Sequence, residues 1–450
     1  MKILYRILSG IFYVLGAVTV SFILYLNMTK SALIALTYAE QVQFQTNTLL
    51  FYFVFAASCV LLVGSAYLAY RDRTSFLAQN GLLLFFLIGA VLYLIAGLFL
   101  IFKVPVSLRT DAEVMYSTAL LVKIIPNVRF IFLMNLLLIL FNNLLILNIT
   151  DALFHHDMRI DFIAILLSFL MLPHLFLCIY SYGIIPGLTA LLLSFLAFIR
   201  FEQGGNVRDA VIGIAGAVLA VTLRGNYVIG VIAELILLIL IFIRSCASDN
   251  NNNNRVRYLI TALILIPILF VPGFIPKAEI EQSTAYSSGS TAFQSIDVAA
   301  GNPDEIENGR NDAYTVLMRK LASTWTEPTF ESVWAGPLEA DAQKISVHFL
   351  RDIYTGGNSY DILNLICGIT SRLLLAGCVI FLIRSLIQWI KDLSESGYSG
   401  SPFTFALFPL LFLIGGFLFY YFRESRSLYV FCYAYMLLPL AAAGLSFGEE

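Results

Sequence analysis

Charge is scarce in this chain. Only 12% of its 450 residues are Asp, Glu, Lys or Arg, whereas 59% are hydrophobic and 14% are aromatic. Soluble domains carry about 25% charged residues, so the deficit excludes an ordinary water-soluble protein. The charges that are present nearly cancel, to a net charge of -2, and they form no long run of Lys or Arg. A nucleic-acid partner is therefore not expected.

The sequence also lacks the patterns that mark metal and cofactor sites. Its six cysteines show no Cys-x-x-Cys spacing, and no Gly-rich phosphate loop, metal-ligand spacing or nucleophile–base pattern occurs. We predict that the cysteines are small core residues. No metal site and no resident cofactor are expected, although the sequence leaves a divalent cation open.

Long apolar runs dominate the sequence. Several exceed the roughly 18 residues that a helix needs to cross a hydrocarbon core of about 30 Å, and the alternation typical of outer-membrane barrels is absent. The predicted fold class is an all-α polytopic membrane protein. About twelve transmembrane helices are expected, at 7–27, 49–70, 81–103, 128–149, 160–180, 184–200, 208–223, 226–244, 257–275, 361–388, 402–421 and 427–446.

One long polar segment interrupts these runs. It covers residues 277–358 and is too long for a simple connector, so we expect it to fold on the membrane surface. The predicted regions are additional N-terminal spans (1–80), a transmembrane module with a first acidic loop (81–276), the polar loop (277–358) and C-terminal transmembrane helices (359–450).

The distribution of Lys and Arg among the short loops predicts the orientation. More of them fall on the side of the N-terminus, which favours a cytoplasmic N-terminus in the cytoplasmic membrane. The acidic stretch "LRTDAEVMYS" (108–117), the turn at Arg224, the loop 277–358 and "FRESRS" (422–427) then all emerge on the extracytoplasmic face, which is the expected active face.

Two acidic residues follow an apolar run. Asp111 and Glu113 are notable because carboxylates snorkel poorly and gain nothing from an anionic bilayer surface. Either could act as a general base, or the pair could hold a divalent cation. An ordinary polar loop is the alternative interpretation.

Basic residues mark two further turns on the same predicted face. Arg224 offers a fork of donors that suits phosphate, and Asn226 begins the next helix, where backbone amides can point at the same anion. A snorkelling anchor is the alternative. Arg423 and Arg426 flank Glu424, and an interfacial salt bridge explains them about as well as phosphate binding.

Glu234 and His174 lie inside predicted spans. Glu234 is the deepest acidic residue, and it could face a partner helix or a wet cavity, with a proton-relay role open. For His174, next to Pro173, we expect an interhelical hydrogen bond rather than a metal ion.

The middle of the chain resembles the core of membrane glycosyltransferases of the GT-C fold, the superfamily of protein mannosyltransferases and aminoarabinose transferases. Within this superfamily it is similar to the bacterial members of glycosyltransferase family 39. An aromatic-Gly-x-x-Pro segment of that family matches Tyr182, Gly183 and Pro186, and its Arg-x-Asn hairpin turn matches Arg224 and Asn226. "STWTEPTFESVW" (323–334) is similar to its Trp-x-x-Pro-Thr-Phe segment, and "ESRSLYV" (424–430) to its late Glu-x-x-Arg-Tyr motif. The likeness covers residues 100–447.

The resemblance implies an enzyme and its substrates. Such proteins take a sugar from a polyprenyl-phosphate donor and transfer it to an extracytoplasmic glycan, lipid or protein acceptor. A carboxylate of the first extracytoplasmic loop acts as general base, which implies Asp111, with Glu113 as runner-up. Basic residues hold the lipid phosphate, which implies Arg224 first and Arg426 second.

Other functions stay open. The segment after Ser117 is shorter than in the family, which allows a catalytically degenerate member. A polymerase or ligase of lipid-linked polysaccharide would have a similar layout of spans and loop. A transporter or flippase would instead depend on an ionisable residue near the bilayer midplane, for which Glu234 is the candidate.

Overall fold

The computed structural model describes residues 1–34, 42–46, 49, 53, 56–57, 60, 76–106, 127–154, 157–180, 183–247, 252–271, 313–333, 336–337, 339–394, 404–422 and 426–446. Helices make up almost all of this part of the chain, and one short hairpin completes it. The elements are α1 (Lys2–Thr29), β1 (Lys30–Ile34), β2 (Val42–Thr46), α3 (Phe76–Lys103), α5 (Val128–Phe154), α6 (Met158–Leu170), α7 (Leu172–Phe176), η1 (Leu177–Ile179), α8 (Ile184–Gly204), α9 (Val207–Leu223), η2 (Gly225–Tyr227), α10 (Val228–Ala247), α11 (Asn252–Ile268), α15 (Ala313–Trp325), α16 (Glu339–Ala342), α17 (His348–Tyr354), α18 (Asn358–Ser394), α19 (Leu407–Phe422), α20 (Ser427–Met436) and α21 (Leu438–Leu445).

Six of these helices are long and apolar enough to cross a membrane, and the number rises to eight if two bent pairs each count as one span. The chain is therefore a multi-pass helical membrane protein, as predicted. Every predicted span except 49–70, most of which lies outside the described residues, coincides with a helix or a bent pair. However, α9, α11 and α19 have only 16 or 17 residues, so a total of twelve stays a prediction.

The two bent pairs have a common cause. α6 with α7 and η1, and α20 with α21, each bend by 51°. In both cases the second helix carries proline near its start, Pro173 in α7 and Pro439 in α21. Proline lacks the N–H that would continue the helical ladder, so the chain changes direction there.

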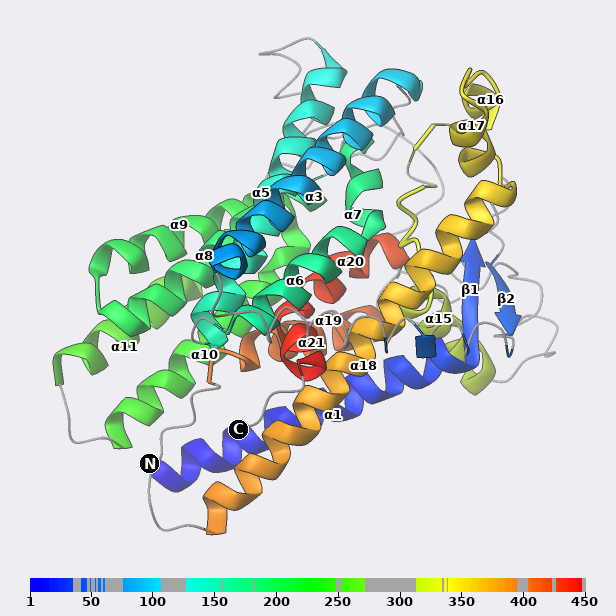
Figure 1. The fold of residues 1–450 in the computed structure, drawn as a ribbon. Coiled ribbons are helices and arrows are strands. Elements are labelled where there is room, and N and C mark those ends of the chain that lie inside the picture. The colour runs from blue at the N-terminus through cyan, green and yellow to red at the C-terminus, as the bar shows by residue number, and fades with distance from the viewer. Residues whose placement is uncertain are drawn as a thin grey trace.

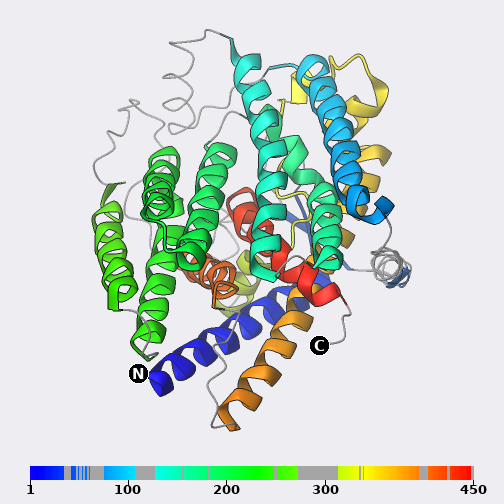
Figure 2. The same ribbon diagram turned by 60° about the vertical axis from the view of Figure 1, so that its left-hand side comes forward.

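The C-terminal helices α20 and α21 occupy the middle of the bundle (Figures 1 and 2). Nearly all their residues are buried. α21 packs against α18, α6 and α5, and α20 packs against α19, α15 and α8. α18 and α21 come into backbone contact at Gly377 and Gly444, where a side chain on either residue would collide with the carbonyl of the facing helix. Small residues allow this close approach in membrane helices.

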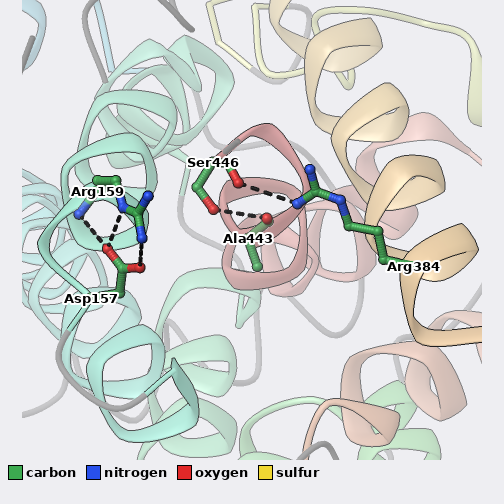
Figure 3. A network of polar contacts seen from close by, with 5 residues as sticks. All are labelled: Asp157, Arg159, Arg384, Ala443 and Ser446. Carbon is green, nitrogen blue, oxygen red and sulfur yellow. Dashed lines mark hydrogen bonds and ion pairs between the residues drawn. The ribbon is translucent and has the colours of Figure 1, made fainter. Parts of the chain in front are cut away.

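Polar contacts fix one end of this central packing (Figure 3). Asp157 accepts a hydrogen bond from the Arg159 backbone N–H at 2.9 Å and caps α6, while the Arg159 guanidinium pairs with the same carboxylate at 2.8 Å. Arg384 of α18 donates to the Ser446 carbonyl at the end of α21, at 3.2 Å. The ends of α6 and α21 are thus held by charge-assisted bonds.

The hairpin is a departure from the all-α prediction. β1 follows α1 directly and pairs antiparallel with β2, with Lys30 opposite Thr46. It lies next to α15, as Figure 1 shows. Residues 320–333 belong to the polar segment 277–358, for which we expected a fold on the membrane surface. They are instead packed inside the protein. This burial places part of the loop against α20, where the candidate site is found.

Candidate functional site

The predicted site residues divide into two groups. Asp111, Glu113, Tyr182 and Arg423 lie outside the described residues, so their positions stay predictions. Arg224, Asn226 and Arg426 are described: Arg224 contacts α20, Asn226 contacts α19, and Arg426 directly precedes α20.

Arg224 occupies the turn between α9 and α10. α9 ends at Leu223, Arg224 is extended with φ of -157°, and η2 leads into α10. The side chain is buried, and its Cζ lies 5.1 Å from the centre of the Tyr429 ring in α20. A guanidinium over an aromatic face gains about 2 kcal/mol when it is desolvated. This contact anchors the turn to α20.

Asn226 and the Gly183 segment complete the surroundings of this turn. The Asn226 Nδ2 donates to the Tyr420 hydroxyl of α19 at 2.9 Å. On the other side, a Cβ on Gly183 would collide with the Leu223 carbonyl, and the Tyr227 hydroxyl donates to the Ile184 carbonyl at 2.8 Å. The aromatic-Gly-x-x-Pro segment therefore packs directly against the Arg-x-Asn turn.

Arg426 is the residue before α20. It is extended, with φ of -129°, and its carbonyl accepts from the Tyr429 N–H at 3.0 Å. Since the Tyr429 ring also faces Arg224, Tyr429 contacts both predicted phosphate-binding arginines. The backbone of Arg426 thus lies within one helical turn of the ring that faces Arg224.

The other side of the same turn meets residues 326–333, which we call the acidic loop. Glu327 Oε1 accepts from the N–H of Thr329 at 2.9 Å and from its hydroxyl. Glu327 Oε2 accepts from the Glu331 N–H at 2.6 Å and from the Ser427 hydroxyl at 3.0 Å. Glu331 in turn accepts from the Leu428 N–H at 2.9 Å, which caps α20 with a carboxylate.

The backbone of the acidic loop is strained. Phe330 and Glu331 have φ of 49° and 52°, and both are non-glycine residues in the left-handed region. Each such residue costs about 1–2 kcal/mol. The conformation turns the Glu331 N–H back towards the Glu327 carboxyl, while the Phe330 ring packs on Phe431 with 5.7 Å between ring centres. Strain of this kind is concentrated at functional sites.

Burial raises the pKa of Glu327 to about 7. The hydrogen bonds from Thr329 and Glu331 act in the opposite direction and lower this pKa, whereas the negative charge of Glu331 raises it further. The carboxyls of Glu327 and Glu331 are almost fully buried, with exposed fractions of 2% and 6%.

A buried cation lies nearby. The fully buried Arg372 of α18 donates to the Asn27 carbonyl at 2.8 Å, and Asn27 donates to the Trp325 carbonyl at 2.9 Å. Two acids and a buried cation thus lie within one polar region.

Several residues of this region were missed by sequence reasoning. Arg372 stands inside the predicted span 361–388, and a charge in an apolar run is a recognised signal. Glu327 and Glu331 occur in the quoted "STWTEPTFESVW", but nothing local in that segment indicates that its carboxylates are buried.

Other predictions concern the core. His174 Nε2 lies 3.4 Å from Asn142 Nδ2 of α5, which confirms the interhelical hydrogen bond. Cys178, Cys367, Cys378 and Cys432 are free and buried, as expected of core residues, whereas Cys246 is free but only half-buried, and Cys59 lies outside the described residues. Within the part of the chain that the structure describes, no group of His, Cys, Asp or Glu could hold a metal ion.

The first turn of α20 thus meets the Arg224 guanidinium and two carboxyls, while the Asn226 amide beside Arg224 bonds to α19. Such an arrangement can hold an anion at Arg224 while the acidic loop fixes the position of the turn. No family model, curated protein or solved structure matches the chain.

Proposed function

We propose that this protein is an integral-membrane glycosyltransferase of the GT-C type, which transfers a sugar from a polyprenyl-phosphate donor to an extracytoplasmic acceptor. One observation supports the proposal above others. The four segments that carry the resemblance are separate in sequence, yet they are in contact. The Arg-x-Asn turn and the segment 323–334 both contact the first turn of α20, which belongs to the late motif, and the Gly183 segment packs against the Arg-x-Asn turn. Sequence similarities that arise by chance would not be expected to lie next to one another in the fold.

The proposed roles follow the chemistry of each side chain. Arg224 binds the lipid phosphate, with Asn226 and Arg426 beside it and with Arg423 and Tyr182 as further contacts. Asp111 accepts the proton of the acceptor hydroxyl, with Glu113 as the alternative base. The proposal includes twelve spans, a cytoplasmic N-terminus and an extracytoplasmic active face.

The test measures consumption of the donor. The purified protein is reconstituted in liposomes with a panel of polyprenyl-phosphate-linked sugars and a membrane extract as acceptor source, and released polyprenyl phosphate is quantified. Asp111→Asn should abolish release. Arg224→Gln should slow it by about 10- to 100-fold, because a charge-assisted hydrogen bond contributes about 1.5–3 kcal/mol.

Arg208→Gln is the matched control, because Arg208 is an exposed arginine at the opposite end of α9. Normal rates in Arg224→Gln would exclude the phosphate role of Arg224. Absence of donor consumption by the wild-type protein would contradict the proposed function itself. A lipid-linked glycan that alone serves as acceptor would identify a polymerase or ligase.

A transporter or flippase is the second candidate, because Glu234 is fully buried in α10. That function predicts that a fluorescent lipid-linked sugar crosses the liposome bilayer, that Glu234→Gln stops the crossing, and that Asp111→Asn leaves it unchanged. The two candidates thus depend on different carboxyls.

A further inference from the structure

Glu234 lies deep inside a membrane-length helix. The span Gly225–Cys246 places it nine residues after one end and twelve before the other, which corresponds to about 14 and 18 Å at 1.5 Å per residue. Its side chain has an exposed fraction of 0%. The carboxyl is therefore near the middle of the bilayer and shielded from lipid by the protein.

Ser194 of α8 is its polar neighbour. α8 and α10 approach closely where Gly230 of α10 faces Leu191, since a Cβ on Gly230 would lie 2.7 Å from the Leu191 side chain. Glu234 follows Gly230 by four residues, and Ser194 follows Leu191 by three. Each therefore lies about one helical turn beyond the Gly230–Leu191 contact, on the side of its helix that faces the other helix. This register places Ser194 beside Glu234.

The hydrogen bond of Ser194 fixes the direction of any bond to Glu234. The Ser194 hydroxyl donates to the Gly213 carbonyl of α9 at 2.8 Å, and a carbonyl can only accept. The single hydroxyl proton is therefore committed, and Ser194 can only accept from Glu234. Among the described residues, neither Glu234 oxygen has a hydrogen-bond partner, and no cation forms an ion pair with the carboxyl.

An ionised carboxylate in such surroundings is strongly disfavoured, because an unpaired buried charge loses its hydration without compensation. We propose that Glu234 is a proton-binding site within the membrane, a neutral acid next to Ser194, whose own hydroxyl donates to the Gly213 carbonyl. The site lies where α10, α8 and α9 pack together. It is independent of the glycosyltransferase proposal.

The surroundings favour a proton over a metal cation. Hard cations such as Ca²⁺ take 6–8 oxygen ligands. Here the described residues place one carboxyl, one hydroxyl and one carbonyl together, which is enough for a proton. Release of that proton would leave a bare charge in the protein interior, so it requires a rearrangement that admits water or a cation between α8 and α10.

Infrared spectroscopy tests the protonation state directly. The purified protein at neutral pH should show C=O stretching bands of protonated carboxylic acids, because Glu327 is also partly protonated near this pH. Glu234→Gln should remove one component that Glu327→Gln leaves in place. Ser194→Ala should keep the Glu234 component, because burial alone disfavours the charge of this carboxyl. A protonated-acid band unchanged in Glu234→Gln, or loss of a carboxylate band instead, would overturn the proposal.

Chemical labelling provides a second measurement that needs no variant. A hydrophobic carbodiimide reacts with protonated carboxyls in apolar surroundings, so mass spectrometry should find the adduct on Glu234 of the wild-type protein. Glu202 is the internal control, because its carboxylate pairs with Arg244 and should stay unlabelled. An unlabelled Glu234 would contradict the proposal. Protection of Glu234 by Na⁺ at fixed pH would show that the ligand is a metal cation rather than a proton.

Discussion

Glu234 and Glu327 are both buried carboxyls, and their surroundings differ sharply. Glu327 accepts four hydrogen bonds, from two backbone N–H groups and two hydroxyls, whereas Glu234 receives none from the described residues. The difference follows from the backbone around each residue. In the acidic loop the N–H groups are not used by a helix and can turn to a side chain, whereas in the middle of α10 the helical ladder uses them all. Irregular backbone thus provides donors for a buried acid, and a continuous helix does not.

The first prediction removes the acid of the loop. Glu327→Ala should lower the free energy of unfolding by about 4 kcal/mol, because several buried donors lose their acceptor and each costs about 1–3 kcal/mol. Denaturant unfolding in detergent, followed by tryptophan fluorescence, measures it. Asp341→Ala is the control, since the ion pair of the half-buried Asp341 with the exposed Lys344 should contribute less than about 1 kcal/mol. Equal effects of the two variants would show that the bonds to Glu327 contribute little.

The second prediction concerns pH. The pKa of Glu327 is raised from 4.5 to about 7 in the folded protein, so the folded state binds this proton more tightly than the unfolded state. Its contribution to stability is present below pH 4.5 and is lost as the pH rises towards 7. The wild-type protein should therefore lose on the order of 3 kcal/mol across this range relative to Glu327→Gln. A rise in relative stability over the same range would mean that the four donors outweigh burial.

The third prediction separates strain from capping at Glu331. Glu331→Ala removes the acceptor for the Leu428 N–H and should cost about 2 kcal/mol. Glu331→Gly loses the same acceptor but accommodates the φ of 52° without a Cβ, so it should be less damaging by about 1 kcal/mol. Thermal unfolding midpoints compare the two, with the exposed Lys344→Ala as control. If Gly proves no better than Ala, the left-handed backbone is not strained.

Much of the fold could be predicted from the sequence because it depends on apolar run length. The helices α1, α3, α5, α8 and α10 follow the predicted spans closely, since hydropathy alone determines which segments favour the bilayer. The hairpin β1–β2 was not predicted, because its strands are short and β2 follows β1 only after several residues. Hydropathy does not indicate which loops return into the bundle.

Only one part of the candidate site, the turn between α9 and α10, could be predicted from the sequence. Arg224 and Asn226 stand out because a tight turn between two spans leaves a polar side chain few alternatives. The structure places Arg224 against α20 and Asn226 against α19. Glu327 and Glu331 become important only through contacts with α20, which lies about one hundred residues away in the sequence. Such long-range contacts cannot be read from local composition.

The last prediction returns to α10 and has the smallest effect and the opposite sign. Glu234→Leu should raise the free energy of unfolding by about 1 kcal/mol, because an apolar side chain of similar volume replaces a polar group with few partners. Ser194 keeps its bond to the Gly213 carbonyl, so the substitution leaves no new donor unsatisfied. Glu234→Gln, as the isosteric control, should change stability by less than about 0.5 kcal/mol. A loss of stability in Glu234→Leu comparable with that of Glu327→Ala would mean that Glu234 has strong partners of its own, and the contrast between the two carboxyls would no longer hold.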